Sequence, residues 1–384
     1  MSDKTAIVYS EAFQHYNFGP THPFTPIRLK LTFELMRAIG LLSSPKVQVQ
    51  EPRQASREEL LLFHDDEYLQ FVERASQSGS GFLDMGDTPA FKGCFESSAL
   101  AVGASLAAVD LVMSGKVMHA INIAGGLHHA HPGRASGFCI FNDPAVSIAY
   151  LKKKYSLERV LYLDVDAHHG DGVMYGFYSD SGVLDIDFHE DGHHLFPGTG
   201  FTEEVGKGDA VGLKINVPLS PFTGNQIYLQ LFKEIVPVAV RNYKPQILLL
   251  QCGADSHAND LLAHLQITTE TYREIAEIIS ALAHEVADGR LVVFGGGGYN
   301  PSNVARAWTV VASTLAKFDI PENTPDVWKR LFEAVIGEEA PKMVRSDGEA
   351  KNEVSDVALK IGTEVLQDLR KRIPLLAMRA DSDK

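Results

Sequence analysis

Residues 160–172, VLYLDVDAHHGDG, carry the signals that decide both the predicted fold and the predicted site. The first four residues, Val160–Leu163, form an apolar run that predicts a buried strand. Three aspartates and two histidines follow within eight positions. Because side chains alternate faces along a strand, Asp164, Asp166 and His168 are expected to project to the same side. Two carboxylates and an imidazole are costly to bury together without a cation, so the stretch predicts a divalent metal site.

Apolar runs of the same kind recur along the chain and alternate with segments of helical period. The predicted strands are Thr5–Tyr9, Ala120–Ala124, Val160–Leu163, Val183–Ile186, Lys214–Val217, Ile247–Gln251 and Leu291–Phe294. The predicted helices are Pro26–Ile39, Phe95–Met113, Pro144–Lys154, Asn225–Asn242, Thr268–Val286 and Pro301–Lys317. Strands that alternate with helices of this length indicate βαβ units, and strands this apolar indicate a parallel sheet covered on both faces. We therefore expect an α/β fold.

No internal repeat, low-complexity block or Pro/Ser-rich linker divides the chain. A single domain over residues 1–384 is the prediction, with its core in about residues 5–320. Residues 321–384, which become more charged after about Gly337, are expected to form peripheral helices. They end in a stretch that should fray, RADSDK at 379–384.

The composition is that of an ordinary globular protein: 384 residues, 45% hydrophobic and 22% charged, with a formal net charge of −14. This acidity argues against a nucleic-acid partner, which usually meets a basic face. It indicates either a solvated surface or a mild attraction for a cationic, lysine-bearing substrate. The three cysteines, Cys94, Cys139 and Cys252, are odd in number and far apart, as in a reduced cytosolic protein. Without an apparent signal peptide or an uninterrupted apolar run of membrane-spanning length, we expect a soluble, cytoplasmic protein with no membrane partner.

Polar residues collect just after the carboxyl ends of five predicted strands. The loops read GGLHHAHPG from Gly125, DVDAHHGDG from Asp164, HEDGHHLFPGTG from His189, CGADSHAND from Cys252 and GGGGYN from Gly295. Open α/β sheets bind their ligands in the crevice outside these strand ends. The five loops therefore predict one shared site.

Three residues in these loops are candidate metal ligands: Asp166, His168 and Asp255. Two carboxylates and one imidazole suit Zn²⁺ or Fe²⁺ and leave coordination positions open for water and substrate, as in a catalytic site. Each residue alone also has a structural interpretation. Asp255 could cap a helix, and His168 could be a hydrogen-bonded core histidine. The joint pattern is what favours a metal.

The adjacent pair His128 and His129 follows two glycines after a predicted strand. The pair could simply be solvated. Beside a metal-activated water, however, an imidazole can serve as general base and then as general acid. Such histidines need a carboxylate to fix their tautomer, and Asp164 and Asp171 are available for that role.

Aromatic residues in the glycine-bearing loops are candidates for substrate contact. Tyr299 follows four glycines, which form either a flexible turn or a hinge that brings the phenol to a developing oxyanion. We do not expect four consecutive glycines to serve packing. Phe138 and Phe196 could pack in the core. Alternatively they line a narrow channel, where burial of four methylenes of an alkyl chain would contribute roughly 3 kcal/mol.

Five motifs in this order, GGLHHA, LDVDAHHGDG, LFPGTG, QCGADSHAND and GGGGYN, resemble the zinc-dependent histone deacetylase family over residues 18–308. The HEDGHHLFPGTG loop and the opening FGPTHPFTPIRLKLT are similar to its bacterial acetoin-utilization branch, the AcuC-like proteins. The resemblance implies the three-layer arginase/deacetylase fold, in which helices flank a central parallel eight-stranded sheet.

The resemblance also implies roles for single residues. The implied ligands of zinc are Asp166, His168 and Asp255. The implied catalytic residues are His128, His129, Asp164, Asp171 and Tyr299. Among these, His129 would be the general base and acid with His128 as its electrostatic partner. Asp171 would hold His129, Asp164 would hold His128, and Tyr299 would polarise the amide carbonyl.

Further residues are implied to bind substrate, product or a second ion. The acyl-lysine tunnel and its rim would involve Phe138, Phe196, Asp87, Gly137, Leu262 and Gly297. The family also binds K⁺, which would here involve Asp164, Asp166, His168, Asp187 and Phe188. Arg28 matches an arginine near an inner acetate-release channel. The chain departs from eukaryotic members where Asp187 replaces a serine, Asn259 a glycine and Leu127 a tryptophan, differences that bear on the ion site, the rim and the pocket.

The implied activity is metal-dependent hydrolysis of acetyl or other short acyl amides on the ε-amine of lysine in proteins. Three alternatives remain. The same residues could deacetylate small amines such as acetylpolyamines. A ureohydrolase of the arginase type would need a two-metal cluster with extra bridging carboxylates. A degenerate module could bind acyl-lysine without cleaving it. The sequence indicates no partner besides this substrate and no oligomeric state.

Overall fold

The computed structural model describes residues 4–345 and 356–377, and a single sheet of eight strands runs through its centre. Every pairing is parallel, and the strand order is β2-β1-β3-β8-β7-β4-β5-β6. The strands are β1 Thr5–Val8, β2 Val47–Gln50, β3 His119–Asn122, β4 Val160–Asp164, β5 Val183–Glu190, β6 Lys214–Leu219, β7 Ile247–Gln251 and β8 Leu291–Phe294. The predicted α/β fold with a parallel eight-stranded sheet is therefore confirmed.

Seven of the eight strands coincide with predicted strands, and the edge strand β2 was not predicted. Its residues, VQVQ, alternate between apolar and polar and are only partly buried, so they lack the apolar run of a central strand. β5 is longer than predicted because its second half, DFHE at 187–190, is polar in sequence yet buried throughout. These buried polar groups lie at the carboxyl end of the sheet, on the side of the predicted site.

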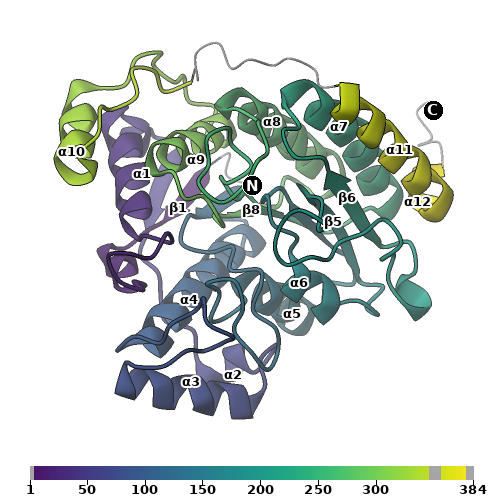
Figure 1. Cartoon of the computed structure of the whole chain (residues 1–384), viewed down its shortest axis with the longest axis horizontal. Coiled ribbons are helices and arrows are strands. Elements are labelled where there is room, and N and C mark those ends of the chain that lie inside the picture. The colour runs from purple at the N-terminus through teal and green to yellow at the C-terminus, as the bar shows by residue number, and fades with distance from the viewer. Residues whose placement is uncertain (1–3, 346–355, 378–384) are drawn as a thin grey trace.

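Helices cover both faces of the sheet and give three layers (Figure 1). One face carries α2 Arg57–Leu60, α3 Asp66–Ser78, α4 Cys94–Met113, α5 Asp143–Tyr155 and α6 Asp171–Gly176. The other face carries α1 Ile27–Ala38, α7 Asn225–Tyr243, α8 Thr269–Val286 and α9 Pro301–Leu315. The six predicted helices agree with observed ones to within two residues at each end, whereas α2, α3 and α6 were not predicted.

Helix α4 is 20 residues long and apolar enough, by length and composition alone, to cross a membrane. In the structure 67% of its apolar window is buried, and the helix packs against β1, β3 and β8 and against α3 and α5. A helix buried on most of its sides is expected to be apolar around its circumference. Packing in the core therefore accounts for this composition.

Three helices after residue 320 lie at the periphery: α10 Asp326–Ile336, α11 Asp356–Arg372 and α12 Pro374–Ala377. Helix α10 covers α1, where Trp328 and Phe332 enter a second apolar cluster and Trp328 Nε1 donates to Leu31 O at 2.8 Å. Helices α11 and α12 pack beside β6 and α7, at the other end of the sheet (Figure 1). The stretch predicted to fray, 379–384, lies outside the described residues.

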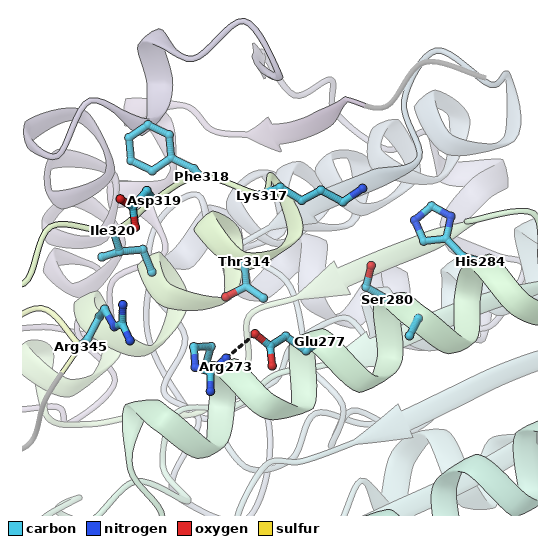
Figure 2. Close-up of a pocket in the computed structure, with 11 residues that line it drawn as sticks. Arg273, Glu277, Ser280, His284, Thr314, Lys317, Phe318, Asp319, Ile320 and Arg345 are labelled. Carbon is cyan, nitrogen blue, oxygen red and sulfur yellow. Dashed lines mark hydrogen bonds and ion pairs between the residues drawn. The ribbon is translucent and has the colours of Figure 1, made fainter.

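The two ends of the strands differ in character. Near the amino end of β3, a groove of about 530 Å³ lies between α8 and the end of α9 (Figure 2). Its charges are of both signs, since Arg273 pairs with Glu277 and Lys317 lies near Asp319 in the sequence. At the carboxyl ends, by contrast, the polar side chains are buried, and the predicted site residues gather there.

One position in α4 leaves no room for a side chain. A Cβ on Gly103 would meet Arg53 O at 1.9 Å and Ala55 N at 2.6 Å, and Ala55 N already donates to Ala99 O at 2.9 Å.

We expect Gly103→Ala to destabilise the fold by about 1–3 kcal/mol, because it overpacks this contact. Urea unfolding measures the change. Ala107→Ser, at a half-buried position of the same helix, should shift the stability by less than about 0.5 kcal/mol. Equal midpoints for Gly103→Ala and the wild type would contradict the close approach.

Candidate active site

The turn after β4 brings the central polar residues together, but not in the way that the sequence predicted. β4 ends at Asp164, so Asp166 and His168 lie in the turn and not on the strand. The aspartates fold this turn: Asp164 Oδ1 accepts from Asp166 N and Asp166 Oδ1 accepts from His168 N, both at 3.0 Å. Side chains two residues apart therefore converge through these local hydrogen bonds, and the expectation from the strand pleat was wrong.

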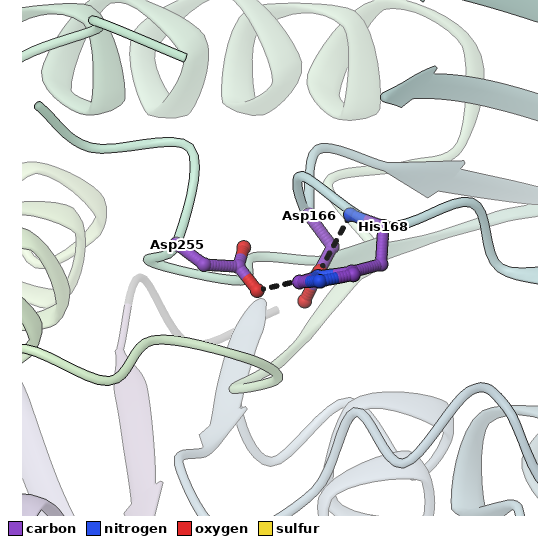
Figure 3. A group of neighbouring side chains, drawn as sticks. All are labelled: Asp166, His168 and Asp255. Carbon is purple, nitrogen blue, oxygen red and sulfur yellow. Dashed lines mark hydrogen bonds and ion pairs between the residues drawn. The ribbon is translucent and has the colours of Figure 1, made fainter. Parts of the chain in front are cut away.

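Asp166, His168 and Asp255 form a compact group of possible metal ligands (Figure 3). Each offers one ligand atom, and these atoms lie within 4.8 Å of one another. His168 Nδ1 lies 3.2 Å from Asp166 Oδ1 and 3.0 Å from Asp255 Oδ2. All three residues are buried. Within residues 4–345 and 356–377 this is the one group of its kind.

In both carboxylates, the outer oxygen, which is the one directed away from the His168 imidazole, accepts hydrogen bonds from neighbouring segments. Asp166 Oδ2 accepts from Gln251 Nε2 and from Gly297 N, both at 2.8 Å. Asp255 Oδ1 accepts from Ala167 N at 2.8 Å. The inner oxygens are thereby held toward the imidazole, so the direction of the ligand atoms is fixed before any ion binds.

The electrostatics of this group favour a bound cation. Burial raises the pKa of Asp255 to about 7, and the nearby Asp166 adds to the shift. Burial lowers the pKa of His168, but its hydrogen bonds to the two carboxylates raise it more, to about 10. Two buried carboxylates thus share one positive charge. A divalent ion supplies positive charge without a proton, so this donor set fits a metal.

Each histidine of the pair that follows β3 is held by its own aspartate. His128 Nδ1 lies 2.8 Å from Asp164 Oδ2, and His129 Nδ1 lies 2.8 Å from Asp171 Oδ1. Asp164 Oδ2 also accepts from the Tyr162 hydroxyl at 2.6 Å. The structure therefore brings together the two histidine–aspartate pairs expected from the sequence.

The two imidazoles face each other through their Nε2 atoms, 3.0 Å apart. A proton fits on only one of these facing nitrogens. Burial lowers the pKa of His128, but Asp164 and then Asp166 raise it more, to about 10. Burial and the charge of His128 lower the pKa of His129 to about 4. At neutral pH His128 is therefore the cation, and His129 is the neutral base that donates Nδ1–H to Asp171.

The glycines before Tyr299 pack directly against the carboxylate group. A Cβ on Gly297 would meet Asp255 Oδ2 at 1.9 Å, and one on Gly296 would meet Gln251 Nε2 at 2.3 Å. The expectation that these glycines do not serve packing was wrong, because the loop passes too close to the site for any side chain.

Tyr299 reaches the same site from the end of this loop. Its ring centroid lies 6.3 Å from that of His168 and 5.9 Å from that of Phe138. Its backbone N donates to Asp260 Oδ2 at 2.8 Å. Burial, together with the charge of Asp255, raises the pKa of the phenol well above its usual value. The hydroxyl therefore keeps its proton at neutral pH and can donate a hydrogen bond.

Two aromatic rings flank the approach to these groups. The Phe196 ring lies 5.0 Å from that of His129 and is 43% exposed, whereas Phe138 packs against Tyr299. Gly137 lies against His129 and Phe196, since its Cβ would meet His129 Cδ2 at 2.5 Å and Phe196 Cε1 at 2.9 Å. Phe138 has a φ of 67°, and its N donates to Thr88 Oγ1 at 3.0 Å. Each ring therefore lies against one candidate catalytic residue, Phe196 against His129 and Phe138 against Tyr299.

Residues expected at the rim lie on two further loops. Asp87 is exposed, and its carboxylate accepts from Thr88 Oγ1 at 3.2 Å, which links it to the Phe138 wall. On the second loop, Leu262 N donates to Asp260 Oδ1 at 2.9 Å. Asn259 has a φ of 66°, a left-handed conformation that glycine and asparagine tolerate best.

Arg28 lies buried against the glycine loop. Its Nη1 donates to Gly296 O at 2.7 Å and Gly298 O at 3.2 Å, and its guanidinium carbon lies 4.1 Å from the Phe24 ring centroid. Arg28 and Leu127 line one small pocket. This position is compatible with the predicted inner channel.

The residues assigned to K⁺ adjoin the His128–Asp164 pair. The register of β4 and β5 places Asp164 opposite Asp187. Both oxygens of Asp187 are engaged, Oδ2 with Gly170 N at 2.7 Å and Oδ1 with His189 Nδ1 at 2.6 Å. Phe188, the next residue on β5, is buried. The potassium site stays a prediction.

Three polar residues at the site were missed from the sequence: Gln251, Asp260 and His131. Gln251 binds Asp166, Asp260 binds Tyr299, and His131 Nε2 lies 3.2 Å from Asp171 Oδ2. All three lie inside or beside the quoted motifs, which was the available signal. They act by holding other residues, so only the folded contacts reveal them.

Comparisons with known proteins agree on one family. The histone deacetylase domain matches residues 22–315. The acetoin utilization protein AcuC of Bacillus subtilis (strain 168) is 41% identical over 332 residues, which cover 84% of this chain and 85% of the relative. AcuC of Staphylococcus aureus (strain MSSA476) is 42% identical over 322 residues, 82% of each chain. The crystal structure of an HDAC homolog from Aquifex aeolicus matches with a TM-score of 0.84 at 29% identity and covers 94% of this chain and 100% of that chain.

The histidine pair predicts a pH dependence of stability. The folded protein raises the pKa of His128 to about 10, above the value of about 6.5 for an unfolded histidine. A raised pKa contributes stability that is fully present below about pH 6.5 and is lost as the pH rises through about 10. We therefore compare the free energies of unfolding of the metal-free wild type and of His128→Gln. The excess, by which the wild type is the more stable of the two, should be larger at about pH 6 than at about pH 9. Urea unfolding measures it, and an excess that grows with pH would contradict the assigned charge.

Proposed function

The chain belongs to the histone deacetylase family, and we propose that it removes acetyl or other short acyl groups from the ε-amine of lysine in proteins. One observation carries the proposal. A neutral imidazole and a protonated phenol lie beside a buried group of metal ligands and against two aromatic rings that would wall a passage; the polar residues are His129, Tyr299, Asp166, His168 and Asp255. These groups can together carry out metal-assisted hydrolysis of an amide.

We assign Zn²⁺, with Fe²⁺ as the alternative, to Asp166, His168 and Asp255. A metal held by these three residues would polarise the acyl carbonyl and lower the pKa of water. The anchored carboxylates support this assignment, because they hold their ligand atoms without rearrangement. We also assign K⁺ to the neighbourhood of Asp164 and Asp187, as the family resemblance implies.

In the proposed mechanism His129 moves the proton. Asp171 fixes the tautomer with the proton on Nδ1, so the lone pair is on Nε2. In the structure this lone pair accepts from His128 Nε2–H, and in the proposed step that contact opens so that Nε2 accepts a proton from the attacking water. Tyr299 donates to the carbonyl oxygen as it becomes negative. His129 then gives the proton to the leaving lysine amine. His128, held as a cation by Asp164, keeps positive charge beside the reacting atoms.

The passage suits an acylated lysine side chain. Phe138 and Phe196 would cover its four methylenes, whose burial contributes roughly 3 kcal/mol. Asp87 at the rim would accept hydrogen bonds from the substrate backbone. The buried cation Arg28 would attract the acetate product toward the small pocket that it lines. The net charge of −14 favours lysine-bearing substrates.

We further propose that the chain works as a single domain in the cytoplasm, with no nucleic-acid or membrane partner. The three cysteines are all free and buried, as expected for a protein kept in reducing surroundings.

Tyr299→Phe tests the proposed function directly. Loss of one donor to an oxyanion should lower kcat on the order of 10²–10³-fold and leave the fold intact. Acetate release by the metal-loaded enzyme would be measured with an acetyl-lysine peptide and with acetylspermidine. Full turnover by Tyr299→Phe would remove the tyrosine from the mechanism. Faster turnover of acetylspermidine by the wild type would make small amines the substrate.

Asp171→Asn tests the tautomer assigned to His129. An amide can donate to Nδ1 where the carboxylate only accepts, so it favours the tautomer in which Nε2 carries the proton and cannot act as the base. We expect kcat to fall on the order of 10²–10⁴-fold. Asp110→Asn is the control, because this carboxylate binds Tyr150 and Lys154 at the surface. Similar rates for Asp171→Asn and Asp110→Asn would refute the assigned role.

A further inference from the structure

The loop of residues 126–132 carries both histidines, yet it contains no helix and no strand of the sheet. Its buried backbone groups therefore need partners elsewhere. Two consecutive residues at the start of α5, Asn142 and Asp143, supply four of them. Both side chains are completely buried. Neither residue is among the candidate site residues expected from the sequence.

Asp143 holds the segment that enters the loop. Its Oδ1 accepts from Leu127 N at 2.9 Å, and its Oδ2 accepts from Gly126 N at 3.1 Å and from Ser105 Oγ at 2.5 Å. A Cβ on Gly125 would meet Asp143 Oδ2 at 2.3 Å, so the backbone passes directly over the carboxylate. A buried carboxylate with three donors is held in one orientation.

Asn142 holds the segment that leaves the loop. Its Nδ2 donates to His128 O at 2.9 Å and to Ala130 O at 2.8 Å. Its Oδ1 accepts from Ala145 N at 2.9 Å and thereby caps α5. The amide cannot rotate without losing one of these three bonds, so the carbonyls on both sides of His129 are tied to the helix.

Helix α6 meets the same amide group. It begins at Asp171, the partner of His129, and its second residue is Gly172. A Cβ on Gly172 would meet His128 O at 2.4 Å, Ala130 O at 2.5 Å and Asn142 Nδ2 at 2.9 Å. The Asn142 amide therefore lies where the histidine loop and α6 touch. A shift of the loop at this point would change the contact between His129 and Asp171.

His64 closes this network from the other side. Its Nε2 accepts from Asn142 N at 2.9 Å, and its Nδ1 lies 3.1 Å from His131 O. Burial lowers the pKa of His64 to about 4, so the ring is neutral and carries one proton. With Nδ1–H donated to the carbonyl, the lone pair on Nε2 faces Asn142. Both the backbone and the side chain of Asn142 are thus fixed.

We propose that Asn142 and Asp143 are positioning residues that keep the histidine loop in register with α6, and so keep His129 aligned with Asp171. The inference rests on the proposed function, because it assumes that this alignment matters for proton transfer. If the two residues only stabilised α5, their loss would lower stability but would not selectively affect kcat.

The test compares two variants with a matched control. Asp143→Asn keeps the size of the side chain but replaces one of the two acceptor oxygens by a donor, so Gly126 N and Leu127 N cannot both keep a partner. Asn142→Asp keeps an acceptor for Ala145 N but has no donor, so His128 O and Ala130 O both lose their partner. The control is Ser147→Ala, which removes a buried hydroxyl without a hydrogen-bond partner from the same helix α5.

Two measurements are made on each metal-loaded protein. Steady-state kinetics on an acetyl-lysine peptide should show kcat lowered on the order of 10²-fold in both variants, as for a misplaced catalytic group, with KM nearly unchanged. Proton NMR should show the low-field imidazole N–H signal of His129 shifted or broadened in both variants and unchanged in Ser147→Ala.

The results separate this inference from the proposed function. Folded variants with wild-type kcat and an unchanged His129 signal would overturn the positioning role. A wild type that releases no acetate from any acyl-lysine or acetylpolyamine would instead overturn the proposed function. In that case the NMR signal would still decide whether Asn142 and Asp143 position the histidine. If Asp143→Asn fails to fold, Asn142→Asp carries the test alone.

Discussion

Buried carboxylates at the carboxyl end of the sheet are the constraint on which the rest of the site depends. Asp164, Asp166, Asp171 and Asp255 are all almost completely buried, and an unpaired buried charge would cost several kcal/mol. Each of them has an imidazole partner and at least one further donor. The hydrogen bonds that offset the cost of burying these carboxylates therefore also fix the imidazoles in position. Proton transfer requires an imidazole that is fixed in this way.

The same constraint explains why the loops are rich in glycine. Backbone N–H groups satisfy a carboxylate only where the backbone comes within hydrogen-bond distance, and at several of these positions the approach leaves no space for a Cβ. Gly297 donates its N–H to Asp166, and a Cβ on it would meet Asp255. Gly126 likewise donates its N–H to Asp143, and a Cβ on the preceding Gly125 would meet the same carboxylate. The glycines thus take part in the electrostatics of the site through their backbone.

Membership of the histone deacetylase family and the geometry of this chain lead to the same chemistry by separate routes. An arginase-type mechanism would require a second set of metal-binding carboxylates. The described residues offer one group of ligands, and the remaining buried aspartates near it are bound to histidines or backbone groups. A neutral base and a protonated phenol at that single group match hydrolysis of an amide better than a two-metal reaction.

The sequence by itself determined the architecture and pointed to the polar residues that the fold brings together. Apolar runs such as Val160–Leu163 identified seven strands, because central parallel strands are buried on both faces. The polar motifs at their ends identified the histidines, aspartates and tyrosine. Strand β2 was not predicted, because an edge strand needs no apolar run. Asp166 and His168 were expected to project as on a strand, but β4 ends at Asp164.

Only the tertiary structure decided how those residues are held. The contacts of Asp143 with Gly126, of Gln251 with Asp166 and of Asp260 with Tyr299 join segments 17, 85 and 39 residues apart. No local pattern encodes such pairs, since an aspartate in a helix start or a glutamine at a strand end is common in any α/β protein. Which of the two histidines is protonated is also decided only by the fold. His128 becomes the cation and His129 the base because of the distances from each ring to the buried aspartates and to the other ring.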